Sequence, residues 1–303
     1  MTDQLGLATT GTPRWERLGR WRVWSTEPAA IPAATWIETV ERLVAAGGSL
    51  HRSKHADTYR WTRSGGDVYV KVYRRYRRWT ALKDWCRPSK AENVRRVSAA
   101  LTAAGFLVPR VRAVGEERTA FGVRRSWCAT AGLGGEPIAT RLAALAQVRD
   151  RTMLHAKRGM LETLGREVAR LHRTGVVAGD LVPANVWIAL AAAELRIAFL
   201  DHDRTRIGRT TVAWRRARRN LVQLNRVALR GVTATDRLRV YRAYAAGQAW
   251  SRAESRRRLP WIVAKTIARR RAERGTPIPP HADFRSVMRA DGPYARPSAE
   301  VQS

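Results

Sequence analysis

Asp180 and Asn185 are the residues of this 303-residue sequence whose types and spacing point most directly to chemistry. They are the first and last residues of the segment DLVPAN, which follows LHRTGVVAG and precedes the apolar run VWI. A carboxylate such as Asp180 can orient a hydroxyl group and accept its proton. The amide oxygen of Asn185 is a hard ligand that suits Mg²⁺. Both side chains can face one pocket if they lie at the ends of a tight loop, and Pro183 restricts the backbone of that loop.

Asp201 is a further candidate, because it ends the apolar segment LRIAFL sixteen residues after Asn185. At the end of a strand, its carboxylate could hold a metal ion that bridges two phosphate groups, and Asp203 could assist.

Both of these motifs also have a simpler explanation. The spacing of Asp180 and Asn185 arises by chance in many loops, and an Asp at a strand end can cap a helix or turn.

Lys71 lies inside the apolar strand candidate VYVKVY, where an unpaired ammonium group is costly to bury. Glu92 follows 21 residues later and is the only acidic residue of the helix candidate 89–104, so it is the expected partner. Lys71 could instead project to solvent from an edge strand. The succession of Lys, Glu, the Asp–Asn loop and the strand-end Asp matches the order of functional residues in protein kinases, and it favours a kinase-like fold.

The periodicity of the surrounding segments predicts an α+β protein with strands first and helices later. The predicted helices span 34–46, 89–104, 136–147 and 152–174, and the predicted strands span 50–61, 67–73, 111–116, 123–130, 186–189 and 196–200. From residue 210 onward the pattern is helical and rich in Arg. We therefore expect a two-lobe protein-kinase-like fold, with an antiparallel sheet plus one helix in the N-lobe and a mostly helical C-lobe.

These patterns divide the chain into four parts. Residues 1–48 are expected to form an N-terminal extension, loosely ordered up to residue 30, with one helix. Residues 49–133 would form the N-lobe, and 134–276 the C-lobe with its basic C-terminal helices. Residues 277–303 are rich in Pro and polar residues and are expected to be a disordered tail.

The charge of the chain restricts its partners. Lys and Arg number 57 and Asp and Glu number 25, so the net charge is +32. Such a field attracts nucleic acid, anionic membrane surfaces or phosphorylated and carboxylated substrates, and it repels a cationic substrate. The Arg- and Ala-rich composition expected of a GC-rich genome explains part of the excess. We find no nucleic-acid fold and no aromatic platform for single strands, which disfavours nucleic acid.

Neither a disulfide framework nor a zinc site is indicated, because Cys86 and Cys128 lie far apart. The sequence shows no signal peptide and no apolar run of about 20 residues that could span a membrane. The expected compartment is therefore the cytoplasm.

Three strings of the sequence resemble the lipopolysaccharide core kinases, the Kdo kinases and heptose kinases of Gram-negative bacteria. They are LHRTGVVAGDLVPANVWI, LRIAFLDHDRTRIG and WRRARRNLVQLNRVALR. The resemblance covers residues 50–245 and is most specific at 171–225. It implies phosphorylation of a Kdo or heptose hydroxyl of the lipopolysaccharide inner core, with ATP and Mg²⁺. It also implies work at the cytoplasmic face of the inner membrane, on an anionic glycolipid that suits the net charge of +32.

The resemblance also implies a role for each candidate residue. Asp180 would be the catalytic base, and Asn185 and Asp201 would hold Mg²⁺. Lys71, oriented by Glu92, would bind the phosphates of ATP. The adenine would lie near the backbone of two further residues, Thr130 and Leu133. Acceptor phosphates or carboxylates could bind to basic residues by bidentate hydrogen bonds, and the candidates are Arg204, Arg206, Arg218 and Arg219. The basic segment 262–274 could lie on an anionic membrane surface.

Three departures from the kinase pattern leave alternatives open. Ala178 replaces the His that scaffolds the loop two residues before the catalytic Asp, and Val182 replaces a Lys of protein kinases. The segment 52–57 has no glycine-rich phosphate loop. One alternative is a weak or inactive kinase-like module that binds lipopolysaccharide or another polyanion. Another is a small-molecule kinase of the aminoglycoside or fructosamine type, although the positive charge argues against a polycationic acceptor.

Overall fold

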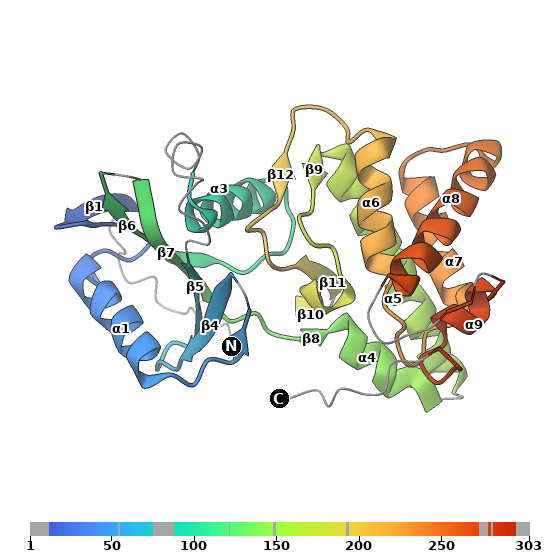
Figure 1. Cartoon of the computed structure of the whole chain (residues 1–303), viewed down its shortest axis with the longest axis horizontal. Coiled ribbons are helices and arrows are strands. Elements are labelled where there is room, and N and C mark those ends of the chain that lie inside the picture. The colour runs from blue at the N-terminus through green and yellow to red at the C-terminus, as the bar shows by residue number, and fades with distance from the viewer. Residues whose placement is uncertain are drawn as a thin grey trace, which may run out of the picture. The chain divides into compact units, whose positions relative to one another are not determined.

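The computed structural model describes residues 12–53, 55–74, 88–120, 122–147, 150–191, 194–272, 278–279 and 281–294 (Figure 1). The chain divides into two compact units. The first unit comprises the described residues up to Ala103 together with Val108–Leu133. The second comprises Ala104–Leu107 and the described residues from Gly134 onward. The division after Leu133 falls within the glycine-rich stretch AGLGG.

The described residues of the first unit form a seven-stranded antiparallel sheet in the order β1-β2-β6-β7-β5-β4-β3. Its strands are β1 (Arg14–Leu18), β2 (Trp21–Ser25), β3 (His51–Arg52), β4 (Ala56–Trp61), β5 (Val68–Arg74), β6 (Val111–Thr119) and β7 (Gly122–Ala131). Two helices accompany it, α1 (Ala33–Ala46) and α3 (Lys90–Ala103). Strand β5, which carries Lys71, lies between β4 and β7. The alternative that Lys71 belongs to an edge strand is therefore wrong.

Alternation along the strands buries one helix on each face of this sheet. Trp36 and Val40 of α1 pack in one cluster with Trp127 of β7, whereas α3 packs with the next residue, Cys128. The ring centroids of Trp36 and Trp127 lie 6.0 Å apart in a stacked arrangement. Gly115 makes this packing possible, because a Cβ there would lie 2.2 Å from the Trp127 ring. The packing of Trp127 thus fixes β7, the strand that ends two residues before the first unit ends at Leu133.

Residues 12–48 do not form a separate extension, contrary to our expectation. Strands β1 and β2 pair with each other, and β2 pairs with β6, so both belong to the main sheet. Helix α1 contributes the fully buried Trp36 to the same core. Strand β1 was not predicted because it is an edge strand that is only partly buried, and a partly buried strand has a weak hydrophobic alternation.

The second unit is mostly helical. Its helices are α4 (Ile138–Ala144), α5 (Arg151–Arg173), α6 (Trp214–Asn225), α7 (Ala234–Gly247), α8 (Arg252–Arg271) and α9 (Phe284–Met288). Its strands are β8 (Glu136–Pro137), β10 (Val186–Ala191) and β11 (Glu194–Phe199) in one sheet, and β9 (Val176–Val177) paired with β12 (Arg206–Ile207). Gly165 lets α5 and α7 approach closely, because a Cβ there would lie 2.4 Å from the Val240 carbonyl oxygen.

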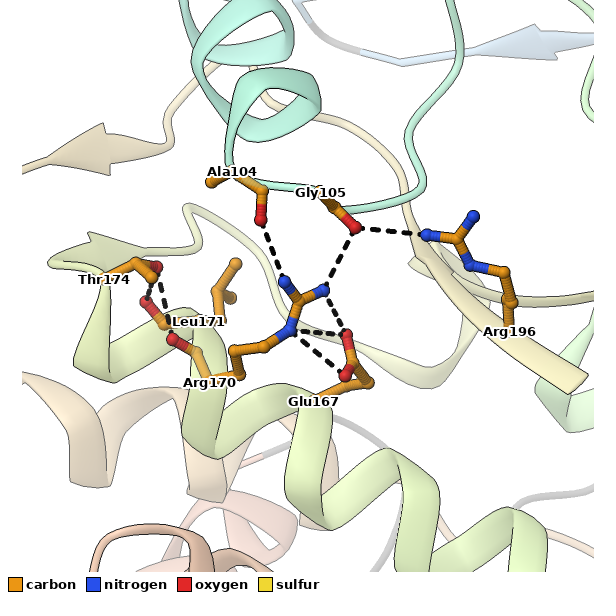
Figure 2. A network of polar contacts seen from close by, with 7 residues as sticks. All are labelled: Ala104, Gly105, Glu167, Arg170, Leu171, Thr174 and Arg196. Atoms are coloured by element: carbon orange, nitrogen blue, oxygen red, sulfur yellow. Dashed lines mark hydrogen bonds and ion pairs between the residues drawn. The ribbon is translucent and has the colours of Figure 1, made fainter.

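Arg170 of α5 ties the segment that begins at Ala104 to the second unit (Figure 2). Its guanidinium donates hydrogen bonds to the carbonyl oxygens of Ala104, at 2.9 Å, and Gly105, at 3.3 Å, and it pairs with Glu167. Arg196 of β11 donates to the same Gly105 oxygen at 3.1 Å. Charged side chains of α5 and β11 therefore hold the backbone of Ala104 and Gly105 within the second unit.

Part of the expected C-terminal tail is ordered. Helix α9 begins after Asp283, whose carboxylate accepts hydrogen bonds from the backbone N–H groups of Arg285 and Ser286. It buries Val287 and Met288 completely or nearly so. The expectation of a disordered tail is therefore wrong for 278–279 and 281–294, and residues 277, 280 and 295–303 of the expected tail lie outside the described residues. Among the described residues, every helix is either too short or too polar to span a lipid bilayer.

Candidate active site

The segment from Asp180 to Asn185 forms a closed loop. It passes from β9 through the 3₁₀ helix Pro183–Asn185 into β10. The Asn185 side-chain nitrogen donates to the Asp180 carbonyl oxygen at 3.0 Å, and the Val182 N–H donates to the same oxygen at 3.0 Å. The amide oxygen of Asn185 is therefore the atom that this side chain can present to a cation, while the Asp180 carboxyl is 46% exposed.

Asp201 lies beside this loop. The Leu200 N–H donates to the Asn185 carbonyl oxygen at 2.9 Å, and β10 and β11 pair so that Val186 faces Phe199. Asp201 has φ +59°, in the left-handed region that non-glycine residues rarely adopt and that often marks functional sites. The structure thus brings Asp180, Asn185 and Asp201 together within the second unit.

These residues fit a magnesium ion by their donor chemistry. Carboxylate and amide oxygens are hard ligands, and Mg²⁺ is usually bound by one or two carboxylates with waters and substrate phosphates rather than by a complete protein cage. The described residues contain no group of three or more His, Cys, Asp or Glu that could hold a metal ion by themselves. Asn185 and Asp201 would be the protein ligands.

Helix α6 supports the backbone of the segment Ala178–Leu181 through two residues whose role the sequence did not reveal. Asn220 is buried, accepts a hydrogen bond from the Ala178 N–H at 3.1 Å and donates to the Ala178 oxygen at 2.8 Å. Gln223 accepts from the Leu181 N–H at 3.4 Å and donates to the Gly179 oxygen at 3.2 Å. The sequence offered one indication of this role: Asn220 and Gln223 are three residues apart in WRRARRNLVQLNRVALR, a segment that carries the family resemblance.

His172 lies behind Asn220, at the end of α5. Its Nε2 lies 3.1 Å from the Asn220 Oδ1, and its Nδ1 lies 2.8 Å from the Tyr244 hydroxyl. Burial lowers the pKa of His172 to about 4, against the opposing effect of its hydrogen bond with Asn220. Asn220 Oδ1 can only accept, so a neutral His172 donates from Nε2 and accepts the Tyr244 proton at Nδ1. The support of the loop therefore continues into the core of the second unit.

His202 occupies the position after Asp201 and is also buried. Its Nε2 lies 2.9 Å from the Phe199 carbonyl oxygen, and its Nδ1 lies 3.4 Å from the hydroxyl of Thr205. Burial lowers the pKa of His202 to about 4, although the Phe199 oxygen and the charge of Asp201 oppose this change. The Thr205 hydroxyl in turn lies 3.2 Å from the Gly179 nitrogen.

The candidates for nucleotide binding lie in the first unit. Lys71 of β5 pairs with Cys128 of β7 in the sheet. Burial raises the pKa of the Cys128 thiol to about 12; the charge of Lys71 lowers this pKa, and the charge of Glu92 raises it. Both charges therefore act at the Cys128 position. Glu92 is buried, and its carboxylate accepts hydrogen bonds from Arg95 and Arg96. The pairing of Lys71 with Glu92 remains a prediction.

Burial opposes ionisation of Glu92, but the hydrogen bonds from Arg95 and Arg96 keep its pKa below the ordinary value. Thr130 lies on β7, and its hydroxyl donates to the Tyr69 carbonyl oxygen at 3.4 Å. Leu133 is half-buried just before the end of this unit. The proposed contact of this backbone with adenine also remains a prediction.

The basic residues suggested for the acceptor differ in their surroundings. Arg204, Arg206 and Arg219 are exposed. Arg218 is half-buried, and its guanidinium lies 4.0 Å from the centroid of the Trp261 ring, so this side chain stabilises the contact of α6 with α8. The sequence did not single out Arg226, whose Nη2 lies 4.0 Å from the Asp180 Oδ1.

Comparisons with known proteins agree on one relationship. A model of the lipopolysaccharide kinase (Kdo/WaaP) family matches residues 45–244. Among solved structures, a chain described as WaaP in complex with acyl carrier protein is similar with a TM-score of 0.57 and 20% identity. The match covers 80% of this chain and 94% of that chain, and at this identity it shows the fold alone. No curated protein matches the sequence.

Proposed function

Because the chain belongs to the lipopolysaccharide kinase (Kdo/WaaP) family, we propose that it transfers the γ-phosphoryl group of ATP to a Kdo or heptose hydroxyl of the lipopolysaccharide inner core. The observation that carries the proposal is the closed loop that presents Asp180 and Asn185 next to the strained backbone of Asp201. These three residues supply a base and two oxygen ligands within one unit. A non-catalytic module that only binds lipopolysaccharide would not require them together.

Asp180 would orient the acceptor hydroxyl and accept its proton, since its carboxyl is 46% exposed and can be reached from solvent. The Gln223 amide nitrogen lies 3.5 Å from the Asp180 Oδ1 and helps to fix the direction of the carboxylate. Asn185 and Asp201 would hold Mg²⁺, which supplies neutralisation of phosphate charge when it is bound. Positioning and charge, without a covalent intermediate, would then account for the transfer.

The remaining assignments rest on family membership and charge. Lys71, oriented by Glu92, is proposed to bind the phosphates of ATP, and the backbone of Thr130 and Leu133 is proposed to lie near its adenine. The net charge of +32 supports an anionic glycolipid acceptor at the inner face of the inner membrane. An acyl carrier protein is a further candidate partner, since the similar WaaP structure contains one.

Phosphate transfer from γ-labelled ATP tests the proposal directly. We expect Mg²⁺-dependent labelling of lipid A that carries Kdo or Kdo plus heptose, and no labelling of lipid A that lacks both sugars. Mg²⁺-ATP should also raise the melting temperature, since a ligand that binds the folded state stabilises it. If neither transfer nor stabilisation occurs at millimolar ATP, the alternative of a non-catalytic module that binds lipopolysaccharide is favoured.

Arg226 is expected to bind an anionic group of the acceptor, because its guanidinium lies beside the proposed base Asp180. Replacing Arg226 with Gln should raise the KM for the acceptor by about 10- to 100-fold, since one charge-assisted hydrogen bond contributes about 1.5–3 kcal/mol. The KM for ATP should not change. Steady-state kinetics with each substrate varied in turn measures both values. Arg158→Gln on the exposed side of α5 is the matched control, and an equal effect of the two variants would contradict this role.

A further inference from the structure

One continuous chain of hydrogen bonds joins the loop that carries Asp180 to Phe199, the last residue of β11, two residues before Asp201. The Gly179 N–H lies 3.2 Å from the Thr205 hydroxyl oxygen, which lies 3.4 Å from the His202 Nδ1. The His202 Nε2 lies 2.9 Å from the Phe199 carbonyl oxygen. Gly179 directly precedes Asp180 in the sequence, so the chain connects the neighbour of the proposed base with the two flanks of Asp201.

The chemistry of the two end groups fixes the direction of this chain. The Phe199 carbonyl can only accept, so Nε2 of His202 carries a proton and donates it. The Gly179 N–H can only donate, so the Thr205 oxygen accepts from it. The hydroxyl keeps its own proton, and the Nδ1 of the buried His202 lies 3.4 Å from its oxygen. Thr205 therefore links Gly179 to His202, and a side chain that lacks the hydroxyl interrupts the chain.

Close packing accompanies these hydrogen bonds. A Cβ on Gly179 would lie 2.4 Å from the Cβ of Arg204, so the catalytic loop lies directly against the turn that contains Arg204 and Thr205. Thr205 and His202 are 2% and 4% exposed, respectively. Water therefore has little access to the hydrogen bonds that they make, and a lost bond there is poorly replaced.

We propose that His202 and Thr205 are positioning residues, which hold Asp180 in register with Asp201 and so take over the scaffold role of the histidine that Ala178 replaces. The inference rests on the proposed function, because it matters for catalysis only if Asp180 and Asp201 act together. Ala178 itself is held by Asn220 through its backbone, so no side chain is needed at that position. The departure at residue 178 is then compatible with an active kinase.

Thr205→Val and Thr205→Ser form the matched pair that tests the inference. Valine keeps the shape of threonine and removes the hydroxyl, whereas serine keeps the hydroxyl. We expect Thr205→Val to lower kcat by about 10- to 100-fold with both KM values unchanged, since a displacement of about 1 Å can have that effect. Thr205→Ser should retain kcat within a few-fold. Hydrogen exchange of the peptide that contains Gly179 should become faster in Thr205→Val only.

A double variant adds a test of coupling. If one chain of hydrogen bonds is responsible, Thr205→Val combined with His202→Phe should lower kcat no more than the larger single effect, because either change interrupts the same chain. His202→Gln, which keeps a donor towards Phe199 but offers no Nδ1 acceptor, serves as the second variant should His202→Phe fail to fold. Additive losses in kcat would overturn the inference.

The exchange measurement separates this inference from the proposed function. If the wild type transfers no phosphate but Thr205→Val still accelerates exchange around Gly179 while Thr205→Ser does not, the proposed function fails and the structural link stands. If the wild type is active and the two Thr205 variants have equal kcat and equal exchange, the proposed function stands and the inference is overturned.

Discussion

Replacing Asp180 with Asn is expected to lower kcat by about 10³-fold, within the range of about 10²–10⁴ that general base catalysis contributes. Asparagine keeps the shape of the side chain and an oxygen that can accept from Gln223, so the loop should keep its structure. The amide cannot accept the proton of the acceptor hydroxyl. Initial rates of phosphate transfer at saturating ATP and acceptor measure the effect.

Two further measurements show whether the loss comes from chemistry. Asp291→Asn changes an exposed carboxylate that pairs only locally with Arg289, and it should leave kcat unchanged. The stabilisation of Asp180→Asn by Mg²⁺-ATP should match that of the wild type, because Asn185 and Asp201 remain. Full turnover in Asp180→Asn would remove Asp180 from the mechanism, whereas loss of Mg²⁺-ATP binding would point to a damaged loop.

Replacing Asp236 with Asn is expected to lower the free energy of unfolding by about 3–5 kcal/mol, the usual loss when one partner of a buried ion pair is removed. Lys157 of α5 and Asp236 of α7 are 8% and 6% exposed, and the Lys157 Nζ lies 2.7 Å from the Asp236 Oδ2. The variant leaves the Lys157 ammonium group with the Gly231 carbonyl oxygen, at 2.6 Å, and removes the carboxylate charge that the ammonium group contacts. Urea denaturation measures the change.

Glu254→Gln is the matched control for this loss. Asp236 and Glu254 occupy the same position in the capping boxes of α7 and α8, but the Glu254 carboxylate is 37% exposed and pairs with Arg258 at the surface. Exposed pairs of this kind contribute less than about 1 kcal/mol. Equal destabilisation by the two variants would mean that the capping box, and not the buried pair with Lys157, accounts for the effect.

The same pair gives the stability of the protein a defined dependence on pH. Burial tends to raise the pKa of Asp236, but hydrogen bonds from Lys157 and Thr233 outweigh it and hold the pKa below its ordinary value. The unfolded state then takes up the proton first, so acidification destabilises the folded state. This contribution is present at neutral pH and is lost as the pH falls below about 4 towards the lower folded pKa. Asp236→Asn should flatten that part of the pH profile.

Local sequence determined the centre of the candidate site. Asp180 and Asn185 are joined by hydrogen bonds that close within six residues, and Asp201 follows because the β10–β11 hairpin places Leu200 against Asn185. Such contacts depend on short spacings, which a sequence displays directly. The order of the motifs also predicted the α+β kinase-like fold, which the match to WaaP confirms, and the family.

Only the tertiary structure decided what supports that centre. Asn220 reaches Ala178 from 42 residues away, and Lys157 reaches Asp236 from 79 residues away. Polar residues with such partners look in sequence like any surface residue, because burial is what makes their hydrogen bonds and charges matter. The part that His202 plays likewise depends on its burial and on its position beside Thr205, which the sequence does not display. The arrangement of Asp180, Asn185 and Asp201 thus follows from contacts between residues close in sequence. The residues that hold this arrangement in place do so through packing between segments distant in sequence.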